Sequence, residues 1–194
     1  MWQPGHAWDA AWTARAPFPY AVVDDFFPAD QVARLMAILD EEHVERYEGD
    51  LFAFEASAPE PATPELRAFR DAFAAALAPR LSRLAGTALR RADLRAYAYR
   101  VGHYLLPHTD HQDELGRALA YAYYLPSPEP PIGGELELFR FRGEVPESAT
   151  LIEPRANRIA IFEVGDTSLH QVREVLRGLR ISIAGWFYPR EPRG

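Results

Sequence analysis

The chain has 194 residues, of which 21 are basic and 28 acidic, so its formal charge is −7. With 48% apolar and 25% charged residues, it has the composition of one globular domain. The negative charge argues against binding to nucleic acid or to an anionic membrane surface. Because there is no cysteine, any metal must be held by histidine and carboxylate side chains. The N-terminus lacks a signal peptide, and no apolar run is long enough to span a membrane, so we expect a cytoplasmic protein.

The first part of the chain, residues 1–92, is predicted to contain an arm, a short strand and two helices. The arm covers residues 1–16. Residues 18–27 are rich in β-branched and aromatic residues, which indicates a short strand with a turn at its end. Asp30 is the expected N-cap of the first helix, whose apolar stripe comprises Val32, Leu35, Met36, Leu39 and Val44.

The second helix follows a stretch, residues 55–64, whose Ala, Pro, Glu and Ser content predicts an exposed loop. Thr63 supplies an N-cap for it and Pro64 a first helical residue. Apolar residues then step by three or four, which predicts a helical face of Leu66, Phe69, Phe73, Leu77, Leu81 and Leu84. Pro79 is expected to kink this helix or divide it in two.

Beyond residue 93 the sequence changes to short runs of β-branched and aromatic residues separated by turn residues. Seven strands are predicted there: Leu94–Tyr99, Ala118–Leu125, Gly134–Phe141, Thr150–Glu153, Arg158–Val164, His170–Val175 and Arg180–Tyr188. Strands of this length and spacing indicate a sandwich or an open barrel, against which the two N-terminal helices pack.

A possible metal site emerges from the histidines, three of which, His103, His108 and His111, fall within nine residues. In an extended segment His108 and Asp110 project from the same face. His170 lies 60 residues further on. Two histidines and one carboxylate form the facial triad that leaves three positions of an octahedral iron open.

Five segments carry further motifs: Tyr99–Asp110, Ala122–Pro126, Gly133–Leu136, His170–Val175 and Arg180–Phe187. Together they resemble a known family, the non-haem iron, 2-oxoglutarate-dependent dioxygenases, and within it the prolyl-hydroxylase branch. The last two segments are particularly similar to the ribosomal-protein prolyl hydroxylases, which share a His-x-Val, an Arg-x-Ser and a terminal Gly-Trp-Phe in this order.

The resemblance implies a mainly β fold with flanking N-terminal helices, the double-stranded β-helix or jelly roll. It implies a single dioxygenase domain over residues 1–194, in which residues 1–92 support a jelly-roll core of residues 93–194. It further implies Fe(II), the co-substrates 2-oxoglutarate and dioxygen, and ascorbate to reduce the iron after uncoupled cycles. The alternative is a cupin-like jelly roll that binds a metal without oxygenase chemistry, or that binds nothing.

The family's functional residues carry over residue by residue. The iron ligands map onto His108, Asp110 and His170, and the cation that pairs with the far carboxylate of 2-oxoglutarate maps onto Arg180. A planar guanidinium suits such a bidentate contact. The phenols that hydrogen-bond the co-substrate map onto Tyr99 and Tyr124, with Ser182 on the face of Arg180.

Two questions of register remain open. Tyr123 takes the place of Tyr124 if its strand is shifted by one residue, because a one-residue slip exchanges the two faces. His111 and Asp113 form a second His-x-Asp pair. We favour His108 as the ligand because Tyr99 then lies nine residues before the first histidine, as in the family, which leaves His111 in a loop at the pocket rim.

The function implied is hydroxylation, most readily of a prolyl residue in a peptide or protein. The alternatives are a free or carrier-bound amino acid or another small molecule as substrate, and a non-catalytic metal-binding module. Two segments are expected to control access to the iron, His111–Arg117 and Tyr47–Pro61. The second is acidic, which favours a basic peptide partner, although a solvated acidic loop explains it equally well. The oligomeric state does not follow from the sequence.

Overall fold

The computed structural model describes residues 2, 4, 12 and 16–189, so most of the expected N-terminal arm lies outside the described residues. The elements before residue 93 are β1 (Tyr20–Val23), α2 (Ala29–Leu39), β2 (Val44–Gly49), β3 (Phe52–Ser57), α3 (Pro64–Ala85) and β4 (Arg91–Ala92). Those after it are β5 (Arg95–Tyr99), β6 (Tyr104–His108), β7 (Leu119–Leu125), β8 (Ile132–Gly133), β9 (Leu136–Arg142), β10 (Val145–Ile152), β11 (Arg158–Glu163), β12 (His170–Val172), β13 (Val175–Arg177) and β14 (Arg180–Tyr188).

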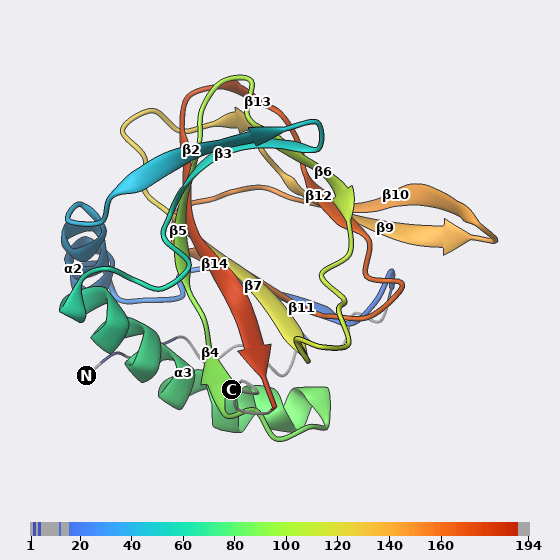
Figure 1. Ribbon diagram of the computed structural model, residues 1–194, viewed down its shortest axis with the longest axis horizontal. Helices are drawn as coiled ribbons and strands as arrows, with labels where there is room; N and C mark the ends of the chain where they lie inside the picture. Colours follow the sequence, from blue (N-terminus) through green and yellow to red (C-terminus); the bar gives the residue numbers. More distant parts are fainter. Residues whose placement is uncertain (1, 3, 5–11, 13–15, 190–194) are drawn as a thin grey trace.

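One antiparallel sheet forms most of the molecule, in the order β1-β11-β7-β14-β5-β3-β6-β12-β9-β10. The sheet curls so that β3, β6 and β12 lie opposite β7, β14 and β11, and the β9–β10 hairpin projects from one side (Figure 1). This arrangement confirms the predicted jelly roll. A short pair, β8 with β13, closes one end.

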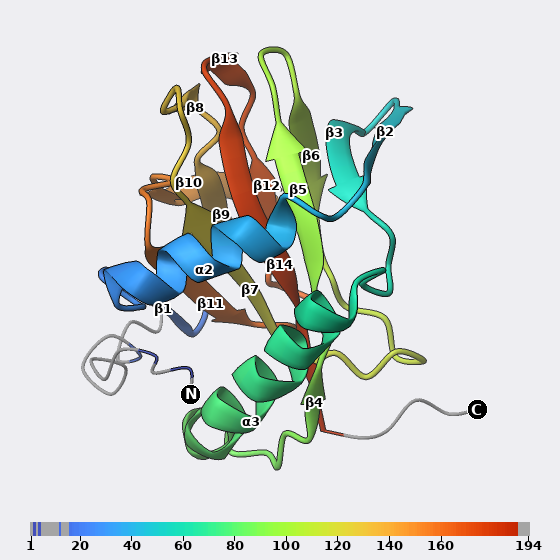
Figure 2. The ribbon, with the colours of Figure 1, turned by 90° about the vertical axis from the view of Figure 1, so that its left-hand side faces the viewer.

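The two helices cover the outer face of the sheet half that contains β7 and β14 (Figure 2). The face of α3 that was predicted from the sequence is buried there, with Phe69 and Phe73 each 1% exposed. Thr63 is its N-cap and accepts a hydrogen bond from the Leu66 N–H, as predicted. Pro79 does not divide α3, which is continuous from residue 64 to 85.

The first helix differs from the prediction at both ends. Its N-cap is Pro28, and Asp30 lies in the first turn, where a carboxylate favours the positive end of the helix dipole. Val44, which we assigned to the helical stripe, belongs to β2. Among the described strands β2 pairs with β3 alone, so most of its side chains are exposed, and charged residues mask the alternation of period two.

Residues 58–63 form the predicted loop, but residues 55–57 and most of the acidic stretch Tyr47–Pro61 belong to the β2–β3 hairpin, and β3 pairs with both β5 and β6. Residues before 93 therefore supply strands to the main sheet as well as helices. Strand β6 was also missed, because Pro107 and a register shift opposite β12 break its pattern. No helix in the described part of the chain is long and apolar enough to cross a membrane.

Candidate metal and co-substrate site

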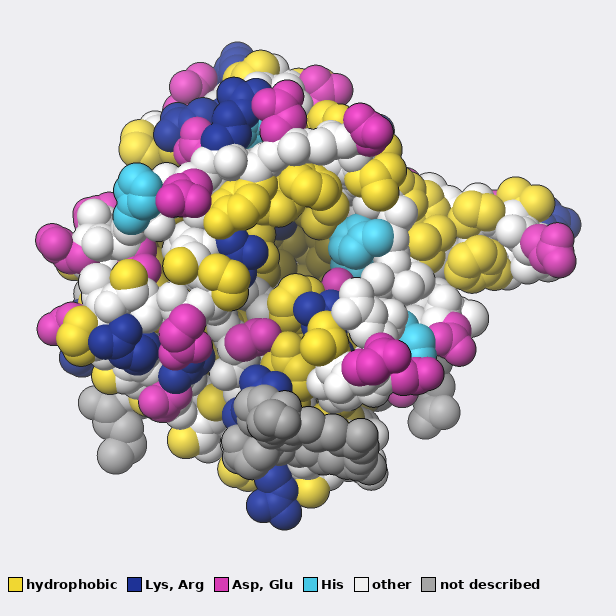
Figure 3. Space-filling model, in the orientation of Figure 1, with side chains coloured by type: hydrophobic (Ala, Val, Ile, Leu, Met, Phe, Trp, Pro, Cys, Tyr) yellow, Lys and Arg dark blue, Asp and Glu magenta, His cyan; other side chains and the backbone are white. Residues whose placement is uncertain are grey.

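A cavity of about 300 Å³ lies between the two halves of the curled sheet. In the space-filling view it is a central hollow rimmed by hydrophobic side chains (Figure 3). The side chains of strand β7 alternate between the helices and the cavity. Those on the cavity side include the small residues Ala120 and Ala122. These alanines leave the volume that a ligand needs.

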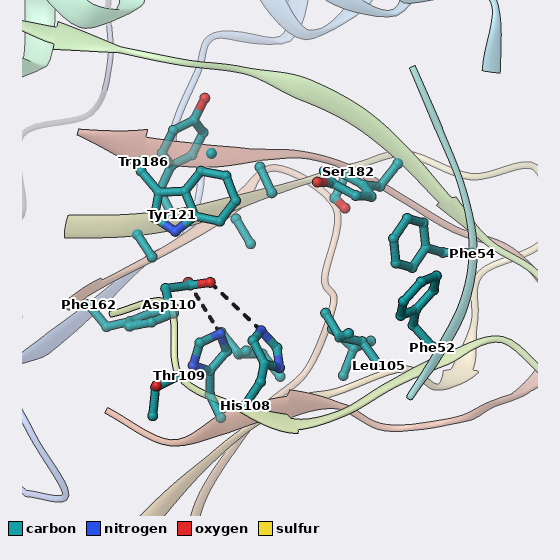
Figure 4. Close-up of a pocket in the computed structure, with 18 of the residues that line it drawn as sticks. Phe52, Phe54, Leu105, His108, Thr109, Asp110, Tyr121, Phe162, Ser182 and Trp186 are labelled. Carbon is teal, nitrogen blue, oxygen red and sulfur yellow. Dashed lines mark ion pairs between the residues drawn. The ribbon is translucent and has the colours of Figure 1, made fainter. Parts of the chain in front are cut away.

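His108, Asp110 and His170 converge at this cavity. Strand β6 ends at His108, Asp110 follows it, and the backbone partner of His108 in the neighbouring strand is His170. One potential ligand atom from each of the three lies within 4.8 Å of the others. The His170 Nε2 is 3.5 Å from Asp110 Oδ2, and the His108 Nε2 is 3.8 Å from Asp110 Oδ1 (Figure 4). The triad of side chains is therefore assembled by the pairing of β6 with β12.

The two imidazoles are held in the tautomer that suits a metal. The Nδ1 of His108 lies 2.8 Å from the Leu106 carbonyl, and that of His170 lies 2.9 Å from the Ser168 carbonyl. Because a carbonyl can only accept, each Nδ1 carries the proton and each Nε2 offers a lone pair toward Asp110. Burial lowers the pKa of His170 to about 4, so this ring is neutral near pH 7.

Arg180, the first residue of β14, is 3% exposed and lines the same cavity. Its guanidinium lies over the Tyr99 ring at 4.7 Å and the Tyr124 ring at 5.0 Å from their centroids. Its Nη1 donates to the Ser182 hydroxyl at 3.2 Å, and no carboxylate among the described residues pairs with it. A buried cation without an acidic partner is costly, which indicates that an anionic ligand completes the site.

Two buried polar atoms in this part of the cavity lack a hydrogen-bond partner among the described residues. They are the Nε of Arg180 and the hydroxyl of Tyr124. Burial raises the pKa of Tyr99 and Tyr124, so both phenols stay neutral and able to donate. Since one cavity holds three potential metal ligands, a guanidinium without an acidic partner and a neighbouring phenol, the residues fit a metal ion together with a chelating dicarboxylate.

The structure places Tyr124 beside Arg180 and Tyr123 on the opposite face of β7. The Tyr123 hydroxyl donates to Asn157 Oδ1 at 2.8 Å, on the side of the helices. His111 does not join the three converging side chains. It lies in the exposed loop after Asp110, where its Nε2 is 3.2 Å from Asp113 and 3.0 Å from Asp166.

Several lining residues were not singled out from the sequence. Arg117 lies 3.6 Å over the Trp186 ring and donates to the Asp110 carbonyl at 3.3 Å. At the other end of the cavity, Phe52 and Phe54 of β3 face inward beside Leu105 (Figure 4). No short motif marks these positions, although the even spacing of Arg180, Ser182 and Trp186 on β14 places Trp186 on the cavity face.

Comparison with known proteins agrees with this geometry. Residues 94–188 match the family model of the 2OG-Fe(II) oxygenase superfamily. Prolyl 3-hydroxylase OGFOD1 of Xenopus laevis is 39% identical over 94 residues, which are 43% of this chain and 18% of that protein. Prolyl 3-hydroxylase sudestada1 of Drosophila melanogaster is 30% identical over 187 residues, 89% of this chain and 34% of that protein.

The crystal structure of a Pseudomonas putida prolyl-4-hydroxylase has the same fold. It superposes with a TM-score of 0.73 at 24% identity, and the match covers 94% of this chain and 98% of that chain. The family match places residues 94–188 in the 2OG-Fe(II) oxygenase superfamily, whose members use Fe(II), 2-oxoglutarate and dioxygen. The chain spans about a third or less of the length of the two curated relatives.

Proposed function

We propose that this chain is an Fe(II)- and 2-oxoglutarate-dependent hydroxylase that acts on a prolyl residue of a peptide or protein. The observation that carries the proposal is the single cavity in which His108, Asp110 and His170 converge and in which Arg180 is buried without an acidic partner. The names of the curated relatives, both prolyl 3-hydroxylases, support the prolyl acceptor.

In this proposal each residue has a separate task. His108, Asp110 and His170 hold the iron, which supplies the activation of dioxygen when it is bound. Arg180 binds the far carboxylate of 2-oxoglutarate with its fork of N–H donors, and Ser182 fixes the guanidinium from one side. Tyr99 and Tyr124 orient the co-substrate and keep water from its carboxylate. We also propose that ascorbate reduces the iron after uncoupled cycles and that the protein is cytoplasmic.

The preference for a basic peptide loses its support, because the acidic residues of the β2–β3 hairpin and the following loop are largely paired. Glu48 pairs with Arg46, Glu55 with Arg100 and Glu60 with Arg70. Pairing cancels most of the field that these carboxylates would exert on an approaching cation. We therefore propose a prolyl acceptor without a requirement for basic neighbours.

A second candidate, hydroxylation of a free amino acid, is favoured by Arg117. Its guanidinium lies at the cavity wall next to Asp110, and its buried Nε has no partner among the described residues. A guanidinium there could pair with the carboxylate of a free amino acid as readily as with a peptide carbonyl.

The test is turnover of the purified chain with Fe(II), 2-oxoglutarate and oxygen. We expect succinate without an acceptor, and more succinate plus a mass gain of one oxygen on proline when a panel of prolyl peptides is supplied. Oxygen incorporation into free proline or another amino acid, and into none of the peptides, would favour the second candidate. Absence of succinate under all these conditions would leave a metal-binding module.

A further inference from the structure

Asp93 lies in the gap between β4 and β5, outside the set of residues assigned so far. The gap faces the point where β14 passes from Gly185 to Trp186, at the end of the cavity away from Arg180. Both β4 and β5 pair with β14, and the short break between them leaves backbone groups of β14 without a hydrogen-bond partner in a neighbouring strand. Asp93 supplies partners to those groups.

Four hydrogen bonds converge on this one residue. Its backbone N–H donates to the Trp186 carbonyl at 3.1 Å, and its Oδ1 accepts from the Trp186 N–H at 2.6 Å. Its Oδ2 accepts from the Tyr188 hydroxyl at 2.7 Å, and its carbonyl accepts from the Tyr121 hydroxyl at 2.8 Å. Trp186 is therefore clamped through its backbone, and two neighbouring aromatic rings are tied to the same point.

The close approach of the two chains depends on Gly185. A Cβ built there would lie 2.4 Å from the Asp93 carbonyl oxygen and 2.7 Å from its Oδ1. Only glycine permits this contact, so residues 93 and 185 together bring the carboxylate against the backbone of β14.

The residues held by Asp93 form one wall of the cavity. Trp186 and Tyr121 both line it, and Trp186 in turn supports Arg117, whose guanidinium covers the indole ring at 3.6 Å. The buried indole N–H and the Arg117 Nε have no hydrogen-bond partner among the described residues.

We infer that Asp93 is a positioning residue for the acceptor end of the cavity: it sets the orientation of Trp186 and, through that ring, of Arg117. The inference rests on the proposed function, because it assumes that the substrate to be hydroxylated binds at the Trp186 end of the cavity. Loss of the carboxylate weakens acceptor binding more than 2-oxoglutarate binding, because Arg180 and Ser182 lie toward the other end of β14 from the Asp93 contact.

The test reads Trp186 directly in the full chain labelled with 5-fluorotryptophan. The chain has four tryptophans, and the ¹⁹F resonance that disappears in Trp186→Phe identifies Trp186. We expect Asp93→Ala to shift or broaden this resonance by more than its linewidth. Asp93→Asn keeps an acceptor for the Trp186 N–H and should shift the resonance less. Tyr188→Phe, which removes the hydrogen bond to Asp93 Oδ2 and a contact with Arg117, provides the measurement if Asp93→Ala does not fold.

Tyr123→Phe is the matched control, because it removes a buried phenol hydrogen bond on the opposite face of β7. It should lower the melting temperature without moving the Trp186 resonance.

Titration with 2-oxoglutarate in the presence of Mn(II) should give Kd values within about two-fold of wild type in the Asp93 variants. On a peptide that wild type hydroxylates, KM should rise at least about five-fold while kcat and acceptor-free succinate formation stay nearly constant.

An unmoved Trp186 resonance in folded Asp93→Ala and Tyr188→Phe would overturn the inference, and so would an equal shift in Tyr123→Phe. A KM for peptide that does not change would also overturn it. If wild type turns over no acceptor, the proposed function fails, whereas the ¹⁹F measurement still decides whether Asp93 orients Trp186.

Discussion

Gly134 lies directly against Arg180: a Cβ at position 134 would come within 3.0 Å of the Arg180 Cδ and equally close to a methyl group of Val175. The backbone of Gly134 has a φ of +71°, which L side chains rarely adopt. The stem of the buried arginine is therefore positioned by the absence of a side chain on the neighbouring segment.

Gly134→Ala should displace Arg180 and reduce the affinity for 2-oxoglutarate by about ten-fold or more, since a small displacement spoils a bidentate contact. Gly143→Ala is the matched control, because its φ is +64° but nothing lies within 4 Å of its added Cβ. Both variants should lose about 1 kcal/mol of stability from the strained backbone. Calorimetric titration should show weakened binding in the first variant only, and equal weakening in both would contradict the contact with Arg180.

Removal of the guanidinium itself should have a larger effect. Arg180→Ala is expected to keep the metal and to lose about 2–5 kcal/mol of binding free energy for 2-oxoglutarate. Arg180→Lys should recover only part of it, because a point charge replaces a fork. Arg158 pairs with Asp24 and Arg173 lies beside Glu137, so alanine at either position should leave the affinity unchanged. A normal Kd in Arg180→Ala would assign the carboxylate to another cation.

The metal site can be tested by single substitutions with bound iron as the measurement. His108→Ala, Asp110→Ala and His170→Ala should each remove most of the iron, because two remaining protein ligands compete poorly with water. His111→Ala and Asp113→Ala should retain it, since neither residue is among the three that converge. Iron that is lost in Asp113→Ala but kept in Asp110→Ala would mean that the second His-x-Asp pair binds the metal.

A pH-dependent prediction concerns Glu42, which is 8% exposed and accepts from the Ala62 and Thr63 N–H groups at the start of α3. Burial by itself would raise the pKa of this carboxyl, but the hydrogen bonds from Thr63 and Ala62 outweigh burial and hold the pKa below its ordinary value of 4.5. A lowered pKa means that the carboxylate stabilises the fold above about pH 4.5 and that this contribution is lost as the pH falls.

Glu42→Gln should therefore lower the free energy of unfolding by about 1–3 kcal/mol near pH 7, with the difference from wild type shrinking toward pH 3. Glu41→Gln, at the exposed neighbouring position, serves as the control. Urea denaturation at several pH values would measure both. A constant difference across this range would show that the charge of Glu42 does not stabilise the start of α3.

Where the sequence carried local patterns, the fold could be predicted from it. The period of four in α3 and the Thr63 cap follow from local chemistry, and the jelly-roll strands around His170 and Arg180 carry both alternation and motif. Strands β2 and β6 could not be predicted, because charges or Pro107 obscure their periodicity and their partners are distant in sequence. The same holds for Phe52, Phe54 and Arg117, which reach the cavity only through tertiary pairing.

Strand β14 carries Arg180 near one end and Trp186 near the other, both facing the cavity, and it pairs with β7 on one side and with β5 and then β4 on the other. Six residues of extended chain span about 20 Å. Because neighbours on both sides fix this strand, the separation of the two binding ends cannot adapt to a longer or shorter acceptor. A change of substrate size during evolution or engineering must therefore come from other segments that line the cavity, β3 and residues 111–117, with β14 left intact.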